Sequence, residues 1–248
     1  MIVYYRISNN SYNKPKLSNV TKESCLDNAL KHFLPFVKEF NIVGDNVTEE
    51  SLKIYLQELE SKHSKINLEF TKLGNAPSFR HVYNLALHHP VDMPIYFLED
   101  DYIHKDNSYS ILLEGLELGD YTTLYDHPDM YHNTADGGDN PFITENGEPT
   151  RVLISKTCHW KISMSTTMTF AAKVSTLMSD IEVWDKHTHG QHPHDFYAFL
   201  ELRERGRKLT YLTCILISCM YRLLITISRL ESRINIMSNK TLILSRLQ

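Results

Sequence analysis

The sequence predicts an α/β protein with an open, mostly parallel sheet and helices on both faces. Strand-like and helix-like segments alternate along the chain, which is the order typical of a doubly wound sheet. Ile95-Tyr96-Phe97-Leu98 forms a short continuous apolar run, as expected for a strand that helices cover on both sides. The 248 residues are enough for one domain of this class.

Three strand and helix units are expected in the first part of the chain. Thr21 is the expected N-cap of the first helix, because apolar residues recur at helical spacing after it. Gly74-Asn75-Ala76-Pro77 is expected to interrupt the chain before Ser78 caps the third helix. The full set is strands at 2–5, 41–43 and 66–70 and helices that begin at Thr21, Thr48 and Ser78.

Strands and helices continue to alternate up to Gly206. Gly119 is expected to end a helix that carries Tyr109, Leu112 and Leu116 on one face. Residues 126–149 are rich in Asp, Asn, Gly and Pro. This composition predicts a long surface loop over the carboxyl edge of the sheet. The other expected elements are strands at 95–98, 121–125, 151–154 and 159–163, a helix after Phe170 and a helix from Asp195 to Arg205.

The charge balance argues against several classes of partner. The 26 basic and 30 acidic residues give a net charge of -4, so no polycationic surface is expected for nucleic acid or an anionic membrane. Four cysteines without CxxC spacing and an N-terminus without an export signal favour reduced thiols and a cytoplasmic location. Before the C-terminal tail, no apolar run reaches the ~20 residues of a membrane span, so no stable membrane insertion is expected.

The strongest chemical feature is the acidic step, which we define as Glu99, Asp100 and Asp101 directly after the apolar run. Adjacent carboxylates repel one another unless a cation or good solvation offsets them. In an extended chain Glu99 and Asp101 point to one side and Asp100 to the other, so two residues can converge on Mn²⁺ or Mg²⁺. Such an ion can also bind a diphosphate and stabilise it as a leaving group. The alternative is a solvated acidic turn that ends a strand.

Asp195 is the second candidate, because it opens a helix in His194-Asp195-Phe196-Tyr197. As an N-cap it would simply accept hydrogen bonds from exposed backbone amides. As a general base it would remove the proton from an acceptor hydroxyl. Its combination with the acidic step favours the second interpretation.

These two blocks resemble the GT-A glycosyltransferases, in an inverting, family-2-like form. The acidic triplet after an apolar strand is similar to the first block of that family, and the segment from Asp195 to Gly206 is similar to the second. The resemblance covers residues 1–208 in element order. It departs from the family in two places, because the usual Asp-x-Asp appears as Glu99-Asp100-Asp101 and because His194 stands where another acid is frequent.

The resemblance implies a role for each of these residues. Glu99 and Asp101 would bind the metal ion, and Asp195 would be the catalytic base. The reaction would transfer a sugar from a nucleoside-diphosphate sugar, with UDP-sugars favoured, to a hydroxyl group of a glycan or another acceptor. The implied contacts to the nucleotide and its phosphates are Tyr5, Arg6, Ser8, Asp45 with its neighbour Asn46, and Asp100. For Asp45, a plain turn residue is the alternative.

A second rank of residues lies where sugar contacts are expected. Trp160 offers an apolar face to a sugar, and the hydroxyls of Ser165-Thr166-Thr167 can bind its polar edges. The alternative is that Trp160 is core and the hydroxyl run is a strand. The candidates for donor-sugar or acceptor contacts are Asp126, His127, Trp160, Thr166 and His194.

A zinc site is a further alternative in the His-rich segment before Asp195. His187, His189, His192 and His194 are potential ligands, and a metal-dependent hydrolase would follow from them. Their spacing is irregular and Gly190 and Pro193 interrupt any helix. A His-rich loop beside a phosphate site is therefore the simpler interpretation.

The tail from residue 209 to 248 differs from the rest of the chain. It contains no Gly, Pro, Asp, Ala, Val, Phe, Trp or His, whereas the family resemblance implies a final strand and a loop with a metal-binding His. We therefore expect a glycosyltransferase domain at 1–208 and an aberrant tail at 209–248, with a change of reading frame or a packed amphipathic helix as its explanations. A catalytically impaired nucleotide-binding relic is the corresponding alternative function.

Overall fold

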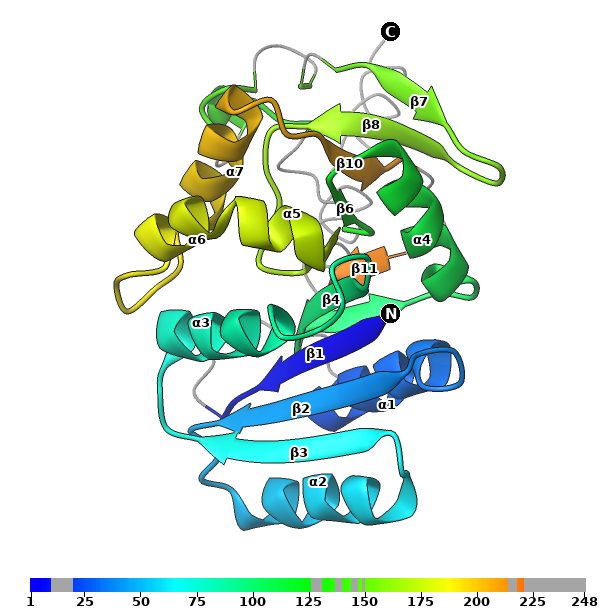
Figure 1. Cartoon of the computed structure of the whole chain (residues 1–248), viewed down its shortest axis with the longest axis vertical. Helices are drawn as coiled ribbons and strands as arrows, with labels where there is room; N and C mark the ends of the chain where they lie inside the picture. Colours follow the sequence, from blue (N-terminus) through cyan, green and yellow to red (C-terminus); the bar gives the residue numbers. More distant parts are fainter. Residues whose placement is uncertain are drawn as a thin grey trace, which may run out of the picture.

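A nine-stranded sheet forms the centre of the protein (Figure 1), with the strand order β3-β2-β1-β4-β9-β6-β10-β8-β7. The computed structural model describes residues 1–9, 20–125, 131–136, 140–143, 147–148, 150–213 and 218–220. The strands are β1 (Ile2–Ile7), β2 (Glu39–Asp45), β3 (Ile66–Thr71), β4 (Pro94–Glu99), β6 (Tyr121–Thr123), β7 (Val152–Ile154), β8 (His159–Ser163), β9 (Phe170–Lys173) and β10 (Leu209–Leu212), with β5 (Tyr102–His104) and β11 (Ser218–Met220) paired separately.

The strand directions confirm the expected fold class. β3, β2, β1 and β4 are parallel neighbours, and β6 is parallel to β10. β9 runs antiparallel to both β4 and β6, while β8 runs antiparallel to both β10 and β7. Every strand of the large sheet except β8 and β9 therefore points the same way, so the sheet is open and mostly parallel.

Helices cover both faces of the sheet. One hydrophobic core holds residues of α1, α2 and α4 against the first face, and a second core holds residues of α3, α5, α6 and α7 against the other. The described helices are α1 (Lys22–Phe33), α2 (Glu50–Lys62), α3 (Asn75–Ala86), α4 (Ser108–Leu118), α5 (Val174–Ser179), α6 (Ile181–His187), α7 (Asp195–Glu204) and the short 3-10 helix η2 (Thr134–Asp136).

Alternation along β4 explains how one apolar run serves both cores. Tyr96 and Leu98 pack in the core of α1, whereas Ile95 and Phe97 pack in the core of α3, because successive side chains of a strand point to opposite faces. The next residue, Glu99, therefore belongs on the side of α3.

The expected helix ends at Thr21 and Gly119 are confirmed. The hydroxyl of Thr21 accepts a hydrogen bond from the amide of Ser24 at 3.2 Å, and the Ser24 hydroxyl accepts one from the Thr21 amide at 2.8 Å. This reciprocal arrangement satisfies two amides that a helix N-terminus leaves open. Gly119 is the C-cap of α4.

Several element boundaries differ from the sequence-based expectation. α3 begins at Asn75 rather than Ser78, because Pro77 is tolerated in a first helical turn, where no intrahelical amide bond is lost. α2 begins at Glu50 rather than Thr48. The segment after Phe170 is first a strand, β9, and becomes helical only at Val174.

The sheet continues four residues beyond the expected domain end at 208. β10 pairs with β6 and β8, and the hydroxyl of Thr210 donates to the carbonyl oxygens of Gly115 at 3.0 Å and Tyr121 at 3.2 Å. Leu209–Leu212 is thus part of the domain. Residues 214–217 and 221–248 lie outside the described residues, so the interpretation of the rest of the tail stays a prediction.

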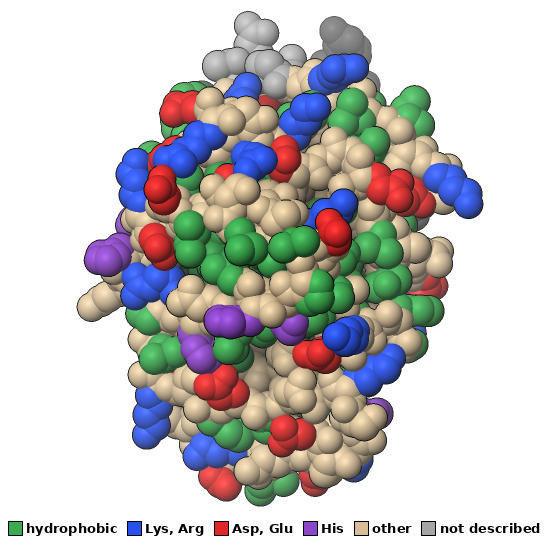
Figure 2. Space-filling model, viewed as in Figure 1, with side chains coloured by type: hydrophobic (Ala, Val, Ile, Leu, Met, Phe, Trp, Pro, Cys, Tyr) green, Lys and Arg blue, Asp and Glu red, His purple; other side chains and the backbone are tan. Residues whose placement is uncertain are grey.

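The described residues agree with the expected surface and thiol chemistry. Basic and acidic side chains are interspersed on the face shown in Figure 2, and Cys25 and Cys158 are buried and form no disulfide with a described residue. None of the described helices combines the length and apolar composition that a bilayer-spanning segment needs. The cytoplasmic location stays a prediction.

Gly115→Ala is expected to destabilise the fold, because a Cβ on Gly115 would lie 2.1 Å from Thr122 Oγ1 and 2.6 Å from Trp160 Cη2. Alanine favours a helix over glycine by about 1 kcal/mol, so propensity alone would give the opposite sign. We expect overpacking to lower the free energy of unfolding by about 1–3 kcal/mol in urea denaturation. Gly190→Ala is the control, since its Cβ would meet nothing closer than 3.9 Å. Equal stabilities of the two variants would contradict the close packing of α4 on the sheet.

Candidate functional site

The acidic step lies at the carboxyl end of β4, the edge at which open α/β sheets bind their ligands. β1 and β4 are parallel neighbours, and Arg6 is the register partner of Glu99. Both residues therefore reach this edge on the same face of the sheet.

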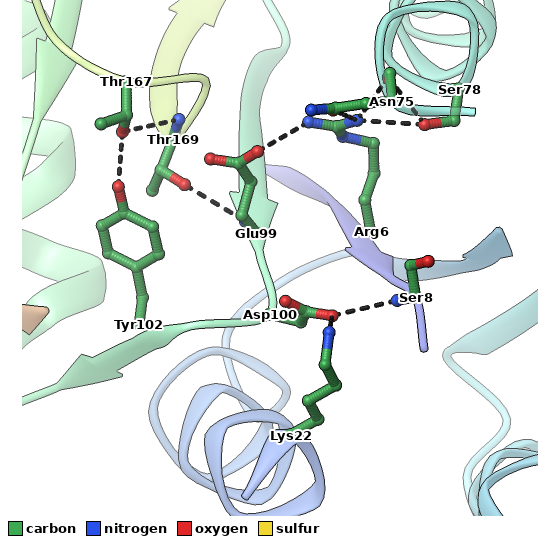
Figure 3. Close-up of polar contacts among 10 residues, drawn as sticks. All are labelled: Arg6, Ser8, Lys22, Asn75, Ser78, Glu99, Asp100, Tyr102, Thr167 and Thr169. Carbon is green, nitrogen blue, oxygen red and sulfur yellow. Dashed lines mark hydrogen bonds and ion pairs between the residues drawn. The ribbon is translucent and has the colours of Figure 1, made fainter. Parts of the chain in front are cut away.

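Arg6 joins Glu99 to the start of α3 (Figure 3). Its Nη2 lies 2.9 Å from Glu99 Oε1, and its Nη1 donates to the carbonyl oxygen of Asn75 at 2.9 Å and to Ser78 Oγ at 3.0 Å. The guanidinium carbon lies 5.5 Å from the ring centre of Phe79. Only 8% of the Arg6 surface is exposed, so its side chain forms a buried link between β1, β4 and α3.

Asp100 points to the opposite side of β4, toward α1 (Figure 3). Its Oδ2 accepts a hydrogen bond from the amide of Ser8 at 3.0 Å and forms an ion pair with the ammonium of Lys22. Lys22 is the first residue of α1. Asp100 thus ties the end of β1 and the start of α1 to the acidic step.

Asp101 lies in the turn that connects β4 to β5. The extended chain ends at Glu99, so the expected alternation through all three acids holds for Glu99 and Asp100 and stops there. Burial raises the pKa of Tyr5 and of Tyr102 well above the usual range. The charges of Asp100 and Asp101 add to the shift of Tyr5, and those of Asp101 and Glu99 add to the shift of Tyr102.

The donor chemistry of the acidic step fits a hard divalent cation, because three successive residues supply carboxylate oxygens. The described residues contain no group of three or more His, Cys, Asp or Glu side chains already arranged to hold a metal ion. Glu99 and Asp100 instead face Arg6 and Lys22. Metal binding by Glu99 would therefore have to share or replace an existing ion pair.

The loop before α7 rests on the start of α3. The amide of Ala76 donates to the carbonyl oxygen of Gln191 at 3.1 Å, and Arg80 Nη1 donates to that of Thr188 at 2.7 Å. Since Arg6 holds the start of α3 to Glu99, the acidic step and the loop that leads to Asp195 lie along one edge of the sheet.

Asp195 is the first residue of α7, and His194 occupies the N-cap position without a side-chain cap bond. The Oδ1 atom of Asp195 accepts a hydrogen bond from the amide of Phe196 at 2.8 Å. Burial raises the pKa of Asp195 above that of an ordinary aspartate. His194 is exposed, and its ring centre lies 6.4 Å from that of Tyr197.

Asp45 has a structural role, which corresponds to the turn alternative. Its Oδ1 accepts from Thr71 Oγ1 at 2.8 Å and from the amide of Leu73 at 2.7 Å, while its Oδ2 accepts from the amide of Gly74 at 2.9 Å and from Asn46 Nδ2 at 2.8 Å. The carboxylate, on a residue that is only 5% exposed, organises the turn before α3 and has no oxygen free of such bonds.

Three other sequence candidates are buried rather than open to a ligand. Tyr5 and Trp160 are fully buried, and the indole Nε1 of Trp160 donates to Ser155 Oγ at 3.0 Å. Trp160 is therefore core, and it offers no face to a sugar. Thr166 is also buried, and its hydroxyl donates to Thr123 Oγ1 at 3.3 Å.

The remaining candidates divide into two groups. Asp126 and His127 lie outside the described residues. In the His-rich segment, His187 Nε2 lies 2.9 Å from Glu201 Oε2, and the segment contributes to no group of three metal-binding side chains within the described part of the chain. The zinc alternative gains no support from this arrangement.

Sequence reasoning missed several residues that hold the acidic step. Lys22 was overlooked, although a lysine at the first position of a helix opposes the helix dipole and signals another partner. The contacts of Asn75 and Ser78 with Arg6 were not predicted, because the sequence places the start of α3 at Ser78 instead of Asn75. Thr169, whose hydroxyl accepts from the amide of Glu99 at 3.1 Å, was hidden because β9 was not recognised.

Comparison with known proteins finds relatives in structure alone. No protein-family model and no curated protein sequence matches the chain. The crystal structure of GalNAc-T7 with UDP, GalNAc and Mn²⁺ is similar with a TM-score of 0.58 at 13% identity, over 86% of this chain and 41% of that one. Residues 1–349 of TarS from S. aureus are similar with a TM-score of 0.52 at 15% identity, over 88% of this chain and 60% of that one. The complex of TarS with UDP gives a TM-score of 0.50 at 16% identity.

These likenesses define the fold, and the protein has the α/β fold of the GT-A glycosyltransferases. The resemblance seen in the sequence is thereby confirmed at the level of the fold. The chain spans only about two fifths of the length of GalNAc-T7 and three fifths of the TarS fragment.

Arg6→Met is expected to lower the free energy of unfolding by about 2–3 kcal/mol, since it removes charge-assisted hydrogen bonds to Glu99 and α3. Methionine keeps an unbranched apolar side chain at this buried position. Arg151→Met serves as the control, because Arg151 is exposed at the edge strand. Urea unfolding followed by circular dichroism measures both. If Arg6→Met lowered the free energy of unfolding no more than Arg151→Met, the contacts of Arg6 would not stabilise the fold.

Proposed function

We propose that the protein is a metal-dependent, inverting glycosyltransferase that moves a sugar from a nucleoside diphosphate, with UDP favoured, to a hydroxyl of a glycan or another acceptor. The observation that carries this proposal is the acidic step on one edge of a GT-A sheet, with the loop leading to Asp195 held along the same edge. The structural relatives support the choice of ligands, because they were solved with UDP, GalNAc and Mn²⁺ or with UDP.

The donor half of the proposed site uses the acidic step. Glu99 and Asp101 would hold Mn²⁺ or Mg²⁺, and the bound ion would offset the charge that develops on the departing diphosphate. The ammonium of Lys22 and the amide of Ser8 already converge on Asp100. If Asp100 gave up these two contacts, the ammonium of Lys22 and the amide of Ser8 would be available to phosphate oxygens.

The acceptor half uses Asp195 as general base. The acceptor hydroxyl gives its proton to the Asp195 carboxylate, and its oxygen forms a bond to the anomeric carbon. The bond from that carbon to the nucleoside diphosphate breaks on the opposite face, and the diphosphate leaves with the electron pair, which inverts the configuration. A raised pKa suits this task, because a carboxylate that is closer in pKa to the hydroxyl group is the stronger base.

Asp101→Ala is expected to weaken UDP binding in the presence of Mn²⁺ by about tenfold or more, which corresponds to one lost charge-assisted contact of ~1.4 kcal/mol. Calorimetric titration of the full chain with UDP, with and without Mn²⁺, measures the effect. Asp92→Ala is the matched control, since Asp92 is exposed away from the acidic step. Unchanged binding in Asp101→Ala, or no binding with any divalent metal, would contradict the proposed donor site.

Asp195→Asn is expected to keep UDP binding and to lose transfer by about 10²-fold or more, because the amide cannot accept the proton. UDP release from UDP-sugars with a panel of hydroxyl acceptors gives the rate, and Asp185→Asn is an exposed control. In the unaltered protein the rate should fall as the pH drops through the pKa of Asp195, and burial makes this fall begin at a higher pH than for an ordinary aspartate. Tight UDP binding by the unaltered chain without any turnover would instead favour the impaired relic.

A further inference from the structure

We propose that His187 is a positioning residue for the transfer reaction, which holds the start of α7, and with it Asp195, in place against α6. This inference rests on the proposed function, because it concerns the general base of that reaction. His187 is the last residue of α6, and it acts through Asp195 rather than on the substrate. The His-rich segment then has a purpose other than metal binding.

His187 contacts α7 at two points. Its carbonyl oxygen accepts a hydrogen bond from the amide of His194 at 2.8 Å, and its imidazole Nε2 lies 2.9 Å from Glu201 Oε2. His194 and Glu201 are about two helical turns apart, so they lie on one face of α7 and are separated by roughly 10 Å. Two attachments at this separation fix the direction of α7 as well as its position, whereas one attachment would act as a pivot.

The contact of the ring with Glu201 is a charge-assisted hydrogen bond. Bonds from Lys186 and His187 lower the pKa of Glu201 to about 2, so its carboxylate is charged and can only accept. The Nε2 atom of His187 therefore carries a hydrogen and donates it. The side chains of His187 and Glu201 are 14% and 18% exposed, whereas that of Lys186 is 66% exposed. His187 is thus the better shielded of the two donors from α6.

The start of α7 depends on support of this kind. His194 occupies the N-cap position without a side-chain cap bond, and such a cap is one of the means by which a helix N-terminus is stabilised. The Asp195 carboxylate accepts a hydrogen bond from the amide of Phe196 at 2.8 Å, so its orientation follows that of the first turn. A shift of this turn therefore moves the carboxylate itself.

The loop between α6 and α7 is held at a further point by α3, which covers the same face of the sheet (Figure 1). Thr188 is buried, and its hydroxyl donates to the carbonyl oxygen of Trp184 at 2.6 Å. The carbonyl oxygen of Thr188 accepts from Arg80 Nη1 at 2.7 Å. The loop is thus fixed to α3 and to α6, and His187 transmits this fixed position to α7.

His187→Asn and His187→Gln form a matched pair of variants. The glutamine amide reaches about as far as the imidazole Nε2 and keeps a donor for Glu201, whereas the asparagine amide is too short to reach. We expect His187→Asn to lower kcat by about tenfold or more, because a small displacement of a catalytic group is costly. The KM for the UDP-sugar and the affinity for UDP should stay unchanged, and His187→Gln should restore most of kcat.

Amide hydrogen exchange of the full chain tests the positioning without any activity. The amides of His194 and Phe196 should exchange about tenfold faster in His187→Asn than in the unaltered protein. His187→Gln should bring both rates back toward the unaltered values. His189→Asn is the control, because His189 is exposed in the same loop, and it should alter neither exchange nor kcat.

Three results would overturn the proposal: exchange rates in His187→Asn equal to those of the control, faster exchange with an unchanged kcat, or a loss of kcat in His187→Gln as large as in His187→Asn. An unaltered protein that transfers no sugar would count against the proposed function alone. In that case the exchange rates still decide whether His187 holds the start of α7.

Discussion

The contact between Arg6 and Glu99 fixes the geometry on which the rest of the site depends. Parallel pairing of β1 and β4 brings the two side chains together, and the same guanidinium reaches the carbonyl and hydroxyl groups at the start of α3. α3 in turn supports the loop that leads to Asp195. One cation with five N–H donors in a planar fork can serve all these partners, whereas a lysine could not.

The other acids are placed by similar compensation. Three adjacent carboxylates would repel one another, yet Asp100 meets Lys22 and the amide of Ser8 on the opposite face of the strand. The protein therefore divides the acidic step between its two faces, with a cation on each. Glu99 and Asp100 are thus ion-paired before any ligand arrives, and a divalent metal that binds either carboxylate would compete with Arg6 or Lys22.

Much of the fold could be predicted from the sequence, because apolar periodicity and caps such as Thr21 and Gly119 act locally. β9 could not be predicted, because a four-residue strand that leads directly into a helix has the same apolar pattern as the helix itself. The position of the acidic step and the likeness to GT-A proteins were also visible in the chain. Other features of the site depend on residues that are distant in sequence, so no local pattern predicts them. They are the burial of Trp160, the four hydrogen bonds of Asp45 and the ion pair of Glu99.

The reversed direction of β9 has a consequence for what can be built at the functional edge. A parallel strand in that position would deliver its last residue there, but β9 delivers the segment that precedes it, with the hydroxyls of Thr167 and Thr169 against Tyr102 and the amide of Glu99. The same strand holds β4 and β6 apart by two strand spacings, roughly 9–10 Å. The carboxyl ends of β4 and β6 are therefore separated beside the acidic step, and the segment between them fixes the backbone of Glu99 through the buried hydroxyl of Thr169.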